Sequence, residues 1–336
     1  MSRYLVVLPD DSAQPILDAI HHAEKSLRIK MFVFSDAHIL AAVIQAHQRG
    51  VKVRIMLNPT RRSGEKENDQ TRETLAAAGI EVIDSTPAFD LTHEKSMMVD
   101  DASAWIMSLN WQQKNFVETR DYALVTSHAH EVKEIIECFE ADWARQSFTP
   151  GEHSHMIWCV GNGRQRIAHF IDEARHSLWV QNERYQDPVI IERLVRANQR
   201  GVKVHIMARP PHTLKTEKLI EGVAGLRILD DVGVKVHKVR ELKLHAKLLF
   251  ADGARAIIGS INLAPGSFDT RRELAIEVKD EHVTIRIDEV IRRDWQNSKA
   301  LDLSDEALLK ELKDTDEDAA EDLALHSNKH HNHLGK

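Results

Sequence analysis

Two short segments of the chain carry the same set of chemically useful side chains. Residues 245–262 read HAKLLFADGARAIIGSIN, and residues 93–110, which lie 152 positions earlier, read HEKSMMVDDASAWIMSLN. Histidine can attack phosphorus or transfer a proton, while lysine, asparagine and serine can donate hydrogen bonds to phosphate oxygens. This set of side chains indicates phosphodiester chemistry. The matched positions are His93 and His245, Lys95 and Lys247, Asp100 and Asp252, Ser108 and Ser260, and Asn110 and Asn262.

The alternation of side chains along β-strands would bring these groups together. Side chains two residues apart share one face of a strand, so His245 and Lys247 project together, as do Ser260 and Asn262 on the next strand. If the two copies pack about a pseudo-two-fold axis, their half-sites form one site. One histidine could then act as the nucleophile and the other could protonate the leaving oxygen. The lysines and asparagines would bind the phosphate, and for Ser108 and Ser260 phosphate contact and a simple strand hydrogen bond are equally open. The chemistry requires neither a metal nor another cofactor.

Two acidic residues stand at equal distances from the two histidines. Asp121 follows His93 by 28 residues, and Glu273 follows His245 by the same 28 residues. A nucleophilic imidazole needs an acceptor for its other ring nitrogen, because that hydrogen bond fixes the tautomer and raises the basicity. We therefore expect Asp121 and Glu273 to hold the catalytic imidazoles.

The similarity between the two copies extends over most of the chain. AHQRGVKVRIM at 46–56 returns as ANQRGVKVHIM at 197–207, and each combines a helix end, a glycine suited to the C-cap and a buried strand. The sequence of each half predicts alternating strands and helices. These are followed by two adjacent strands that carry the motif, then by one further strand and a closing helix. The predicted fold class is therefore α/β, with two similar α/β/α sandwich lobes, each around a mixed, mostly parallel central sheet.

Composition divides the chain into three segments. We expect the first lobe to comprise residues 1–149 and the second to comprise residues 150–300, with a turn at Pro150 and Gly151 where they join. Residues 301–336 combine an acidic run with a polar, His-rich end, and we expect a disordered tail. The clustered histidines of this tail would bind a metal ion only incidentally. They are His326, His330, His331 and His333.

Charge and hydropathy limit the partners. The 336 residues include 45 Lys and Arg against 52 Asp and Glu, so the formal charge of −7 disfavours a broad nucleic-acid surface and is compatible with a small basic cleft. The first apolar run is too short for an export signal, and no window reaches the roughly 20 apolar residues of a membrane span. Cys138 and Cys159 lack CxxC spacing, which favours reduced thiols. We expect a cytoplasmic protein whose contact with a membrane would be peripheral, at the inner surface.

The doubled pattern HxKx4DxxxxxxGSxN resembles the signature of the phospholipase D superfamily. The copy from His245 to Asn262 fits without exception, and the resemblance covers about residues 3–299. It implies two α/β/α lobes with a catalytic cleft between them, and a phosphohistidine intermediate that water or an alcohol resolves. It also implies that His93 and His245 divide the roles of nucleophile and general acid. Comparison with two-motif phospholipases favours His93 as the nucleophile, whereas the intact second motif favours His245.

The first copy departs from the pattern at one position, where Met107 stands in place of the glycine found at Gly259. Glycine allows close backbone approach, whereas methionine fills space with an adaptable thioether, so we expect Met107 to narrow the cleft. Asp100 and Asp252 fall on the strand face opposite the motif lysines, and we assign them structural roles in ion pairs or turns.

Three further segments are candidates for substrate contact. NPTRRSGEKENDQTR at 58–72 and RPPHTLKTEK at 209–218 follow equivalent strands at their carboxyl ends, where ligands bind in open α/β sheets. For these loops, substrate contact and a solvated charged surface are equally open. Their candidate residues are Arg61, Arg62, Lys215 and Lys218. NERYQD at 182–187 could line the cleft, with Tyr185 as a packing residue.

The favoured function is a phospholipase D-like phosphodiesterase or phosphatidyltransferase, similar to the cardiolipin synthases, that acts on a phospholipid. A monomer suffices for a complete site. One alternative is a metal-independent nuclease of the same superfamily, which the negative charge disfavours and which nucleic-acid cleavage in EDTA would support. The other is a non-catalytic pair of lobes that binds phosphoryl ligands, which a lack of both turnover and phosphohistidine would support.

Overall fold

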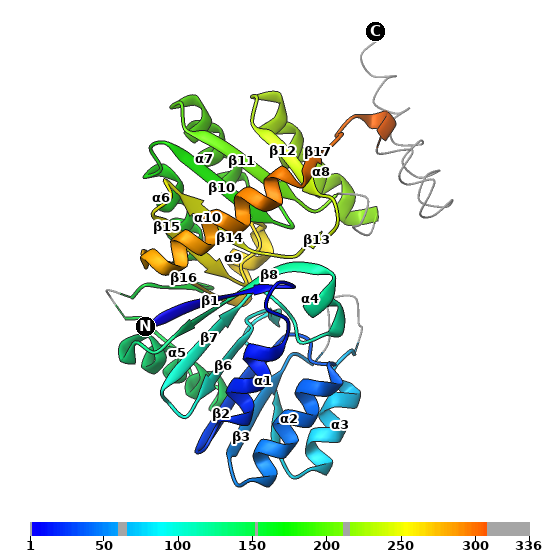
Figure 1. Ribbon diagram of the computed structural model, residues 1–336, viewed down its shortest axis with the longest axis vertical. Helices are drawn as coiled ribbons and strands as arrows, with labels where there is room; N and C mark the ends of the chain where they lie inside the picture. The colour runs from blue at the N-terminus through cyan, green and yellow to red at the C-terminus, as the bar shows by residue number, and fades with distance from the viewer. Residues whose placement is uncertain (1, 60–65, 152–153, 211–215, 308–336) are drawn as a thin grey trace.

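The computed structural model describes residues 2–59, 66–151, 154–210 and 216–307, and the side chains of all of these except 216–221. Two similar sets of elements follow one another along the chain (Figure 1). The first set is β1 (Arg3–Leu8), α1 (Gln14–His21), β2 (Ser26–Met31), α2 (Ala37–Gln48), β3 (Lys52–Leu57), α3 (Asp69–Ala77), β4 (Glu81–Asp84), β5 (Leu91–Thr92), β6 (Ser96–Val99), β7 (Ser103–Met107), α4 (Gln113–Val117), β8 (Thr119–Thr126) and α5 (Ala129–Trp143).

The second set repeats this order and adds one strand at its end. It comprises β9 (Met156–Cys159), α6 (Gly163–Asp172), β10 (Ser177–Asn182), α7 (Pro188–Gln199), β11 (Lys203–Ala208), α8 (Thr216–Asp231), β12 (Lys235–Val239), β13 (Lys243–Leu244), β14 (Leu248–Ala251), β15 (Arg255–Gly259), α9 (Pro265–Asp269), β16 (Arg271–Val278), α10 (Glu281–Gln296) and β17 (Ser298–Ala300).

Each set of strands forms a mixed sheet. The first sheet has the order β1-β8-β7-β6-β2-β3-β4, and the second has the order β17-β12-β11-β10-β14-β15-β16, with β9 also beside β16. Parallel pairing joins β2, β3 and β4, and it joins β10, β11 and β12. The motif strands pair antiparallel with their neighbours. The prediction of two mixed α/β lobes is confirmed, but the expectation of mostly parallel pairing fails in the motif half of each sheet, because tight turns can join only antiparallel strands.

The hairpin turns inside the two motifs depend on aspartate. Asp100 and Asp252 have φ values of +55° and +56°, a left-handed conformation that aspartate tolerates better than most residues. The Asp100 carboxylate accepts the N–H of Ser26 at 2.8 Å, and Asp252 accepts that of Ser177 at 2.9 Å. Burial alone would raise the pKa of both carboxyl groups, but the backbone donors outweigh it and hold each pKa below its ordinary value. Both aspartates therefore tie a hairpin to the first residue of the adjacent strand.

The repeated RGVKV segments connect a helix to a buried strand in each lobe. Asp36 caps α2 by accepting the N–H of two first-turn residues, and Asp187 caps α7 by accepting the N–H of Ile190. Gly50 and Gly201 follow the two helices with φ values of +96° and +87°, which glycine adopts without strain. The strands β3 and β11 begin immediately afterwards, as the sequence predicts.

Helices cover both faces of each sheet, and one apolar cluster joins the lobes. In the first lobe, α1, α2 and α3 lie on the face opposite α5 (Figure 1). Each lobe has its own outer apolar cluster. A third cluster contains Phe139 of α5, Ile287 of α10, and Ile106 and Ile258 from the motif strands of both lobes. Because this cluster removes apolar surface of both lobes from water, it favours their association. Among the described residues, no helix has the length and apolar character needed to cross a membrane.

Met107 lies in the core and not in the cleft. Its side chain is fully buried in the apolar cluster of the first lobe. Successive strand residues point to opposite faces, and the next residue, Ser108, faces the motif carboxylate. The expectation that Met107 narrows the cleft is therefore wrong. At Gly259 a Cβ would lie 2.3 Å from the Leu274 carbonyl oxygen, so the second lobe requires glycine where the first lobe accommodates a large side chain.

Two buried ion pairs connect the lobes in a reciprocal way. Arg120 of β8 donates to both carboxylate oxygens of Asp294 on α10, at 2.8 and 2.9 Å. Arg272 of β16 donates to both oxygens of Asp142 on α5, at 3.1 and 2.8 Å. Each arginine thus crosses to the closing helix of the other lobe, and the two-point geometry fixes the relative orientation of the lobes.

Candidate active site

A short strand that precedes each motif histidine pairs with a strand of the opposite lobe. β5 pairs in parallel with Arg271 and Arg272 of β16, and β13 pairs in parallel with the start of β8. The N–H of His93 donates to the carbonyl oxygen of Arg272 at 2.9 Å, and that of His245 donates to the carbonyl of Arg120 at 3.2 Å. The backbone at each histidine is therefore fixed by the lobe that carries the other histidine.

The two histidine–carboxylate pairs are consequently crossed. His93 Nδ1 lies 2.9 Å from Glu273 Oε2, and His245 Nδ1 lies 2.8 Å from Asp121 Oδ1. Asp121 and Glu273 do contact the imidazoles, as expected from the sequence, but each acts on the histidine of the other copy. Neither lobe alone contains a complete pair.

The motif serines position the carboxylates. Ser108 Oγ donates to Asp121 Oδ1 at 2.6 Å, and Ser260 Oγ donates to Glu273 Oε2 at 2.6 Å. Both serines are fully buried. Each hydroxyl also accepts an N–H of the neighbouring strand, Ser108 from Tyr122 at 2.9 Å and Ser260 from Leu274 at 3.1 Å. Of the two roles that the sequence left open, the strand hydrogen bond is the one observed.

The environment of His93 defines its tautomer. Its Nδ1 contacts the Ser260 carbonyl oxygen at 3.1 Å as well as the Glu273 carboxylate, and a carbonyl oxygen can only accept. The proton is therefore on Nδ1, and the lone pair is on Nε2. Burial, with the positive charges of Lys95 and Lys247, holds the pKa of His93 well below its ordinary value. This imidazole is neutral near pH 7.

The pKa values of the carboxyl groups beside the two histidines shift in opposite directions. Burial raises the pKa of Glu273 above its ordinary value. Burial would also raise the pKa of Asp121, but His245, Lys247 and the Ser108 hydroxyl outweigh it and hold the pKa below its ordinary value. Asp121 is therefore ionised beside His245, whereas burial works against the ionised form of Glu273 beside His93.

The two motif lysines converge on the same space. Lys95 Nζ donates to the carbonyl oxygen of His93, and Lys247 Nζ donates to that of His245 at 2.5 Å. Burial holds the pKa of Lys95 well below its ordinary value, and the charge of Lys247 lowers it further. Because like charges from different lobes act on each other here, the site favours the binding of an anion, which in turn would favour the charged lysines.

The two half-sites differ in the side chain that lies beside the motif lysine. In the first, Phe32 packs edge-on against His93, with ring centroids 4.9 Å apart, and Lys95 Nζ lies 5.1 Å from the Phe32 centroid. In the second, the equivalent residue is Glu183, whose Oε1 lies 3.3 Å from Lys247 Nζ. Burial would raise the pKa of Glu183, but Lys247 and His245 hold it well below its ordinary value. The NERYQD segment therefore contributes a carboxylate to the site.

The motif asparagines retain capacity for further hydrogen bonds. Asn262 Nδ2 donates to Glu183 Oε1 at 3.1 Å. The side-chain oxygens of Asn110 and Asn262 are buried and have no hydrogen-bond partner within the described part of the chain. Buried polar atoms normally find partners, so these two amides are suited to contact a bound substrate.

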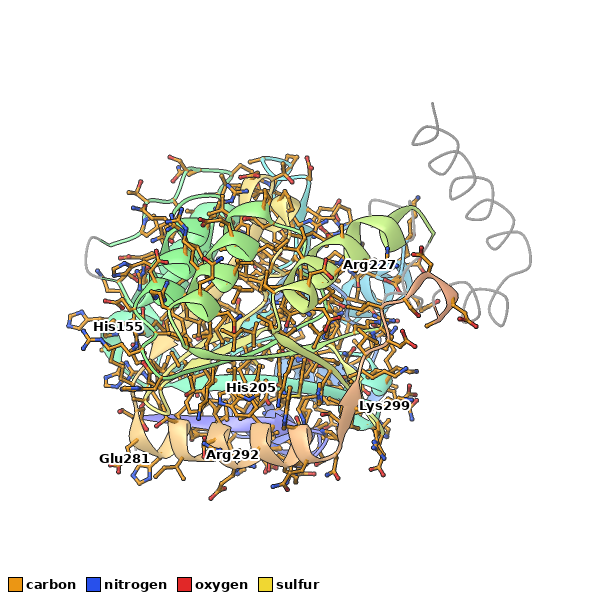
Figure 2. All side chains as sticks on the ribbon, turned by 90° about the horizontal axis from the view of Figure 1, so that it is seen from above. His155, His205, Arg227, Glu281, Arg292 and Lys299 are labelled. Atoms are coloured by element: carbon orange, nitrogen blue, oxygen red, sulfur yellow. The ribbon has the colours of Figure 1, made fainter. Side chains whose placement is uncertain are left out.

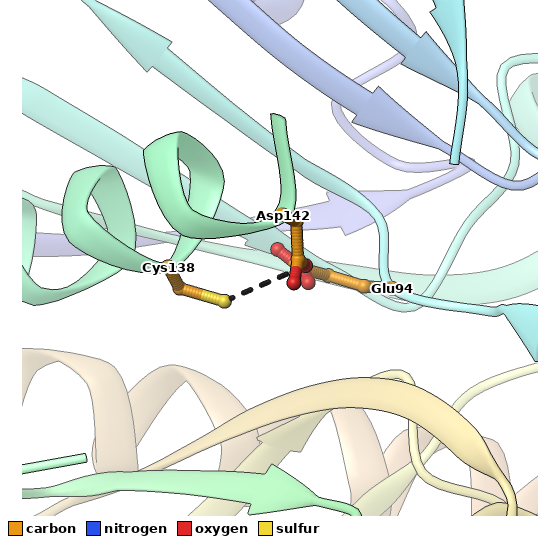
Figure 3. A group of neighbouring side chains, drawn as sticks. All are labelled: Glu94, Cys138 and Asp142. Carbon is orange, nitrogen blue, oxygen red and sulfur yellow. Dashed lines mark hydrogen bonds between the residues drawn. The ribbon is translucent and has the colours of Figure 1, made fainter. Parts of the chain in front are cut away.

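A buried acidic cluster near the site is paired with two cationic side chains. Glu94, Cys138 and Asp142 place potential metal-ligand atoms within 4.8 Å of one another (Figure 3). Lys30 Nζ lies 2.9 Å from Glu94 and 2.8 Å from Asp142, and Arg272 also binds Asp142. Burial raises the pKa of the Cys138 thiol, which disfavours the thiolate that a metal needs. The ammonium and guanidinium groups neutralise this cluster.

Several sequence predictions lie outside the described residues. Arg61, Arg62 and Lys215 belong to this group, as do the four clustered histidines of the tail, and the side chain of Lys218 is likewise not described.

Tyr185 is buried and its hydroxyl donates to the Met207 carbonyl oxygen at 2.8 Å, in agreement with a packing role.

Four residues of the site were not identified from the sequence. Phe32 covers His93, and Arg271 lowers the pKa of that histidine. Thr119 Oγ1 donates to Asp121 Oδ2 at 2.6 Å, and Asn115 Nδ2 does so at 3.2 Å. The repeat aligns Phe32 with Glu183, Thr119 with Arg271 and Asn115 with Ser267. Because each pair differs in residue type, matching the two copies does not identify these positions.

Comparisons of sequence agree with the doubled architecture. A family model described as cardiolipin synthase, PLD-like domain, matches residues 16–143 and again 167–295. Cardiolipin synthase B from Shigella flexneri is 24% identical over 318 residues, which cover 80% of this chain and 74% of the synthase. Polyphosphate kinase from Vibrio parahaemolyticus is 25% identical over 280 residues, and the match spans 78% of this chain but only 39% of the kinase.

Comparisons of structure support the fold. Phosphatidylserine synthase from Haemophilus influenzae Rd KW20 superposes with a TM-score of 0.75 at 12% identity, covering 99% of this chain and 94% of the synthase. Polyphosphate kinase from Porphyromonas gingivalis has a TM-score of 0.66 at 17% identity, covering 87% of this chain and 50% of the kinase. Both similarities establish a shared two-lobed architecture.

Proposed function

Because the chain belongs to the cardiolipin synthase, PLD-like domain family, we propose that it is a phospholipase D-like phosphodiesterase or phosphatidyltransferase that acts on phospholipids. The observation that carries this proposal is the crossed arrangement of two histidine–carboxylate pairs around one site. Such a site provides a nucleophile on one side of phosphorus and an acid on the other. The two lobes together complete it, so a monomer suffices.

His93 is the nucleophile in this mechanism. Its neutral ring carries the Nδ1 proton toward Glu273 and the Ser260 carbonyl, which leaves the Nε2 lone pair for attack on phosphorus. The new bond joins Nε2 to phosphorus, and the bond from phosphorus to the leaving oxygen breaks. A covalent phosphohistidine results.

His245 is the general acid. The ionised Asp121 beside its Nδ1 stabilises the imidazolium, whose Nε2 proton passes to the leaving oxygen. The now neutral His245 then removes a proton from water or an acceptor alcohol. That oxygen attacks phosphorus, the bond to His93 breaks, and hydrolysis or transfer is complete.

The phosphate charge is balanced by groups of the chain. Lys95 and Lys247 supply positive charge, and the Nδ2 amide groups of Asn110 and Asn262 can donate hydrogen bonds to phosphate oxygens. Preorganised donors of this kind stabilise the charge that develops in the transition state. The mechanism therefore needs no metal ion.

The choice of a phospholipid rests on the relatives. Cardiolipin synthase B and phosphatidylserine synthase are enzymes whose names specify phospholipid products. The chain would meet its lipid as a cytoplasmic protein, in peripheral contact with the inner membrane surface. A nuclease and a non-catalytic phosphoryl-binding protein remain the alternatives, and the net charge of −7 disfavours nucleic acid.

Turnover of lipid vesicles tests this function. The full chain is incubated with phosphatidylglycerol vesicles, with and without added ethanol as the acceptor alcohol, and the products are separated by chromatography. We expect phosphatidic acid from hydrolysis, or a new phosphatidyl ester from transfer, and loss of both in His93→Ala and in His245→Ala. A product that persists in both variants, or no product at all, would contradict the lipid assignment.

A second candidate comes from the polyphosphate kinases among the relatives. Their similarity spans the same two lobes, but the chain covers less than half of the Vibrio enzyme. Incubation with ATP and radiolabelled polyphosphate tests phosphoryl transfer directly. Chain extension that requires His93 and His245, without any lipid product, would replace the phospholipid assignment by this one.

A further inference from the structure

One carboxylate contacts the groups that the second motif provides for phosphate. It belongs to Glu183, which directly follows β10 and has a side chain that is 10% exposed. Glu183 Oε1 lies 3.3 Å from Lys247 Nζ and accepts a hydrogen bond from Asn262 Nδ2 at 3.1 Å. Both partners are groups that the sequence assigns to the phosphate. A negative charge of the protein therefore stands beside the place where the negative charge of the substrate would bind.

The charges around Glu183 keep it ionised. Burial alone would raise the pKa of its carboxyl group, but Lys247, His245 and two arginines hold that pKa well below its ordinary value. Its second oxygen, Oε2, lies 3.6 Å from Arg209 Nη1. The charge also acts across the lobes, because burial lowers the pKa of Lys95 and Glu183 opposes this effect. Glu183 thus contributes a full negative charge to the site near neutral pH.

The first half-site has no acid at the related position. The repeat aligns Glu183 with Phe32, whose ring centroid lies 5.1 Å from Lys95 Nζ. No ion pair joins Lys95 to a carboxylate in the described part of the chain. The fold therefore accommodates an aromatic ring where the second lobe has a carboxylate. Because packing does not require an acid here, the charge of Glu183 calls for a role in the site.

Glu183 also limits the hydrogen bonds that the second half-site offers to a phosphate. The Lys247 ammonium has three N–H donors, of which one is bound to the His245 carbonyl oxygen and one faces Glu183. The Asn262 amide has two donors, and one of them is bound to Glu183. Each side chain keeps one donor for a ligand. This suits a phosphodiester, which has two free oxygens and one negative charge, better than a monoester, which has three free oxygens and nearly two charges.

We propose that Glu183 makes the site selective for the charge of the phosphate group, so that singly charged diesters bind and doubly charged monoesters or terminal phosphates are rejected. This inference rests on the proposed function and names its substrate class. Of the two positive charges that Lys95 and Lys247 supply, Glu183 offsets one. Its repulsion of a ligand grows in proportion to the charge of that ligand. The same property disfavours the terminal phosphate of ATP or of polyphosphate as the reacting group.

Binding of two small anions of similar size tests this selectivity without turnover. The probes are methyl phosphate, whose second pKa of about 6 gives it nearly two charges at pH 8, and dimethyl phosphate, which has one. Calorimetry on the full chain measures the Kd of each, and the readout is the ratio of the first Kd to the second. The variant is Glu183→Gln. The matched control is Glu281→Gln, which removes an exposed carboxylate at the start of α10 (Figure 2).

The wild type should bind dimethyl phosphate more tightly than methyl phosphate at pH 8. We expect Glu183→Gln to lower the ratio of the two Kd values tenfold or more, because the lost charge acts about twice as strongly on the dianion as on the monoanion. Glu281→Gln should leave the ratio within twofold. Glu183→Asp retains the charge and should stay closer to the wild type than Glu183→Gln does.

Three outcomes would overturn the proposal. The first is an unchanged ratio in Glu183→Gln, and the second is an equal fall in Glu281→Gln. The third needs no variant and therefore holds even if Glu183→Gln does not fold: it is a wild type that prefers the dianion at pH 8, as an uncompensated pair of lysines would. At pH 5 both probes carry a single charge, so the wild-type ratio should approach one.

Turnover of chromogenic esters gives a second readout. p-Nitrophenyl phosphate differs from bis-p-nitrophenyl phosphate by the same single charge at pH 8. Glu183→Gln should raise kcat/KM for the monoester relative to the diester by tenfold or more. If the lipid assay fails while the anion selectivity and its loss in Glu183→Gln are observed, only the lipid assignment is refuted. Lipid turnover with an unchanged anion ratio in Glu183→Gln would refute the role of Glu183 alone.

Discussion

His93 and Glu273 are separated by 180 positions in the chain, yet His93 Nδ1 and Glu273 Oε2 lie 2.9 Å apart. The histidine belongs to the first copy of the motif and the carboxylate to the second. The reciprocal contact joins His245 to Asp121 across 124 positions. The orientation of each imidazole is therefore a property of the assembled lobes, and changes at the junction between the lobes should affect the chemistry of both histidines.

The two histidines should respond differently to the leaving group. In bis-p-nitrophenyl phosphate the leaving p-nitrophenolate needs little protonation, so loss of the general acid matters less than loss of the nucleophile. We expect His93→Ala to abolish turnover and His245→Ala to retain measurable formation of phosphohistidine. Rapid quench followed by detection of acid-labile phosphate on the protein measures this. The reverse pattern would make His245 the nucleophile.

The carboxylates should be needed for turnover although neither contacts the substrate. Glu273→Gln and Asp121→Asn preserve shape but remove the negative charge and replace one acceptor oxygen beside the imidazole by an NH2 donor. In a Ser-His-Asp site the corresponding change lowers kcat by about 10⁴-fold, and we expect a loss of about 10²-fold or more here. Steady-state assays at constant pH measure it. The KM should change little, and a selective rise in KM would instead indicate direct substrate contact.

The activity of His93 should persist at unusually low pH. Burial and the nearby cations hold the pKa of His93 below 6.5, so the ring remains the neutral nucleophile as pH falls through that value. The acidic limb of kcat/KM should therefore lie below pH 6.5. Arg271 contributes to this lowering, so Arg271→Gln should move the limb to higher pH, while Arg196→Gln on α7 should leave it in place. A wild-type limb above pH 6.5 would contradict this.

The lowered pKa of His93 also makes the stability of the fold depend on pH. The unfolded chain, with a histidine pKa of about 6.5, binds more protons than the folded chain below that pH. The contribution of His93 to the free energy of unfolding should therefore decrease as pH falls below about 6.5. Urea denaturation of wild type and His93→Ala between pH 5 and 7 measures it, and the difference between the two should depend on pH in this window.

The crossed ion pairs should be essential for the stability of the junction. Asp294→Asn removes the buried countercharge of Arg120 and leaves only the partly exposed Asp10 beside it, and breaking a buried pair lowers the free energy of unfolding by about 3–5 kcal/mol. The double change Arg120→Met/Asp294→Leu should cost less, because no charge is left buried. Urea denaturation compares them. The exposed Lys133–Glu137 pair is a control, and Lys133→Ala should change stability by about 1 kcal/mol or less. Equal losses in all three variants would refute the argument.

Met107 should matter for stability and not for substrate access. Its side chain is fully buried in the core of the first lobe, so Met107→Ala should leave a cavity and lower the free energy of unfolding by about 2–5 kcal/mol. The kcat/KM of the folded variant should remain near that of the wild type at low temperature. A faster enzyme with unchanged stability would instead place Met107 in the cleft.

The internal repeat made much of the fold and site predictable from the sequence. Two matched motifs identify His93, His245 and their lysines, because independent histidines would not share the same spacing of Lys, Asp, Ser and Asn. The repeat also locates Asp121 and Glu273 as candidate acceptors. Local periodicity is sufficient for the alternating strands and helices, since each depends on residues close in the sequence.

The partners of these residues depend on the packing of the lobes. Equal spacing cannot distinguish Asp121 beside His93 from Asp121 beside His245, and only the pairing of β5 with β16 and of β13 with β8 selects the crossed arrangement. Met107 shows the same limit, because its position in the motif does not tell which face of β7 its side chain occupies. Phe32 and Glu183 occupy equivalent positions but differ in residue type. Matching the two copies therefore identifies neither of them, and the asymmetry between the half-sites is not predicted.

The sequence by itself determined the doubled architecture and the chemical groups of the site, because both are encoded in local patterns that occur twice. The tertiary structure decided which carboxylate orients which histidine, and that the serines act on the carboxylates. These contacts join residues far apart in the chain. Their geometry follows from strand register and from the packing of two lobes, and neither is specified by residue spacing alone.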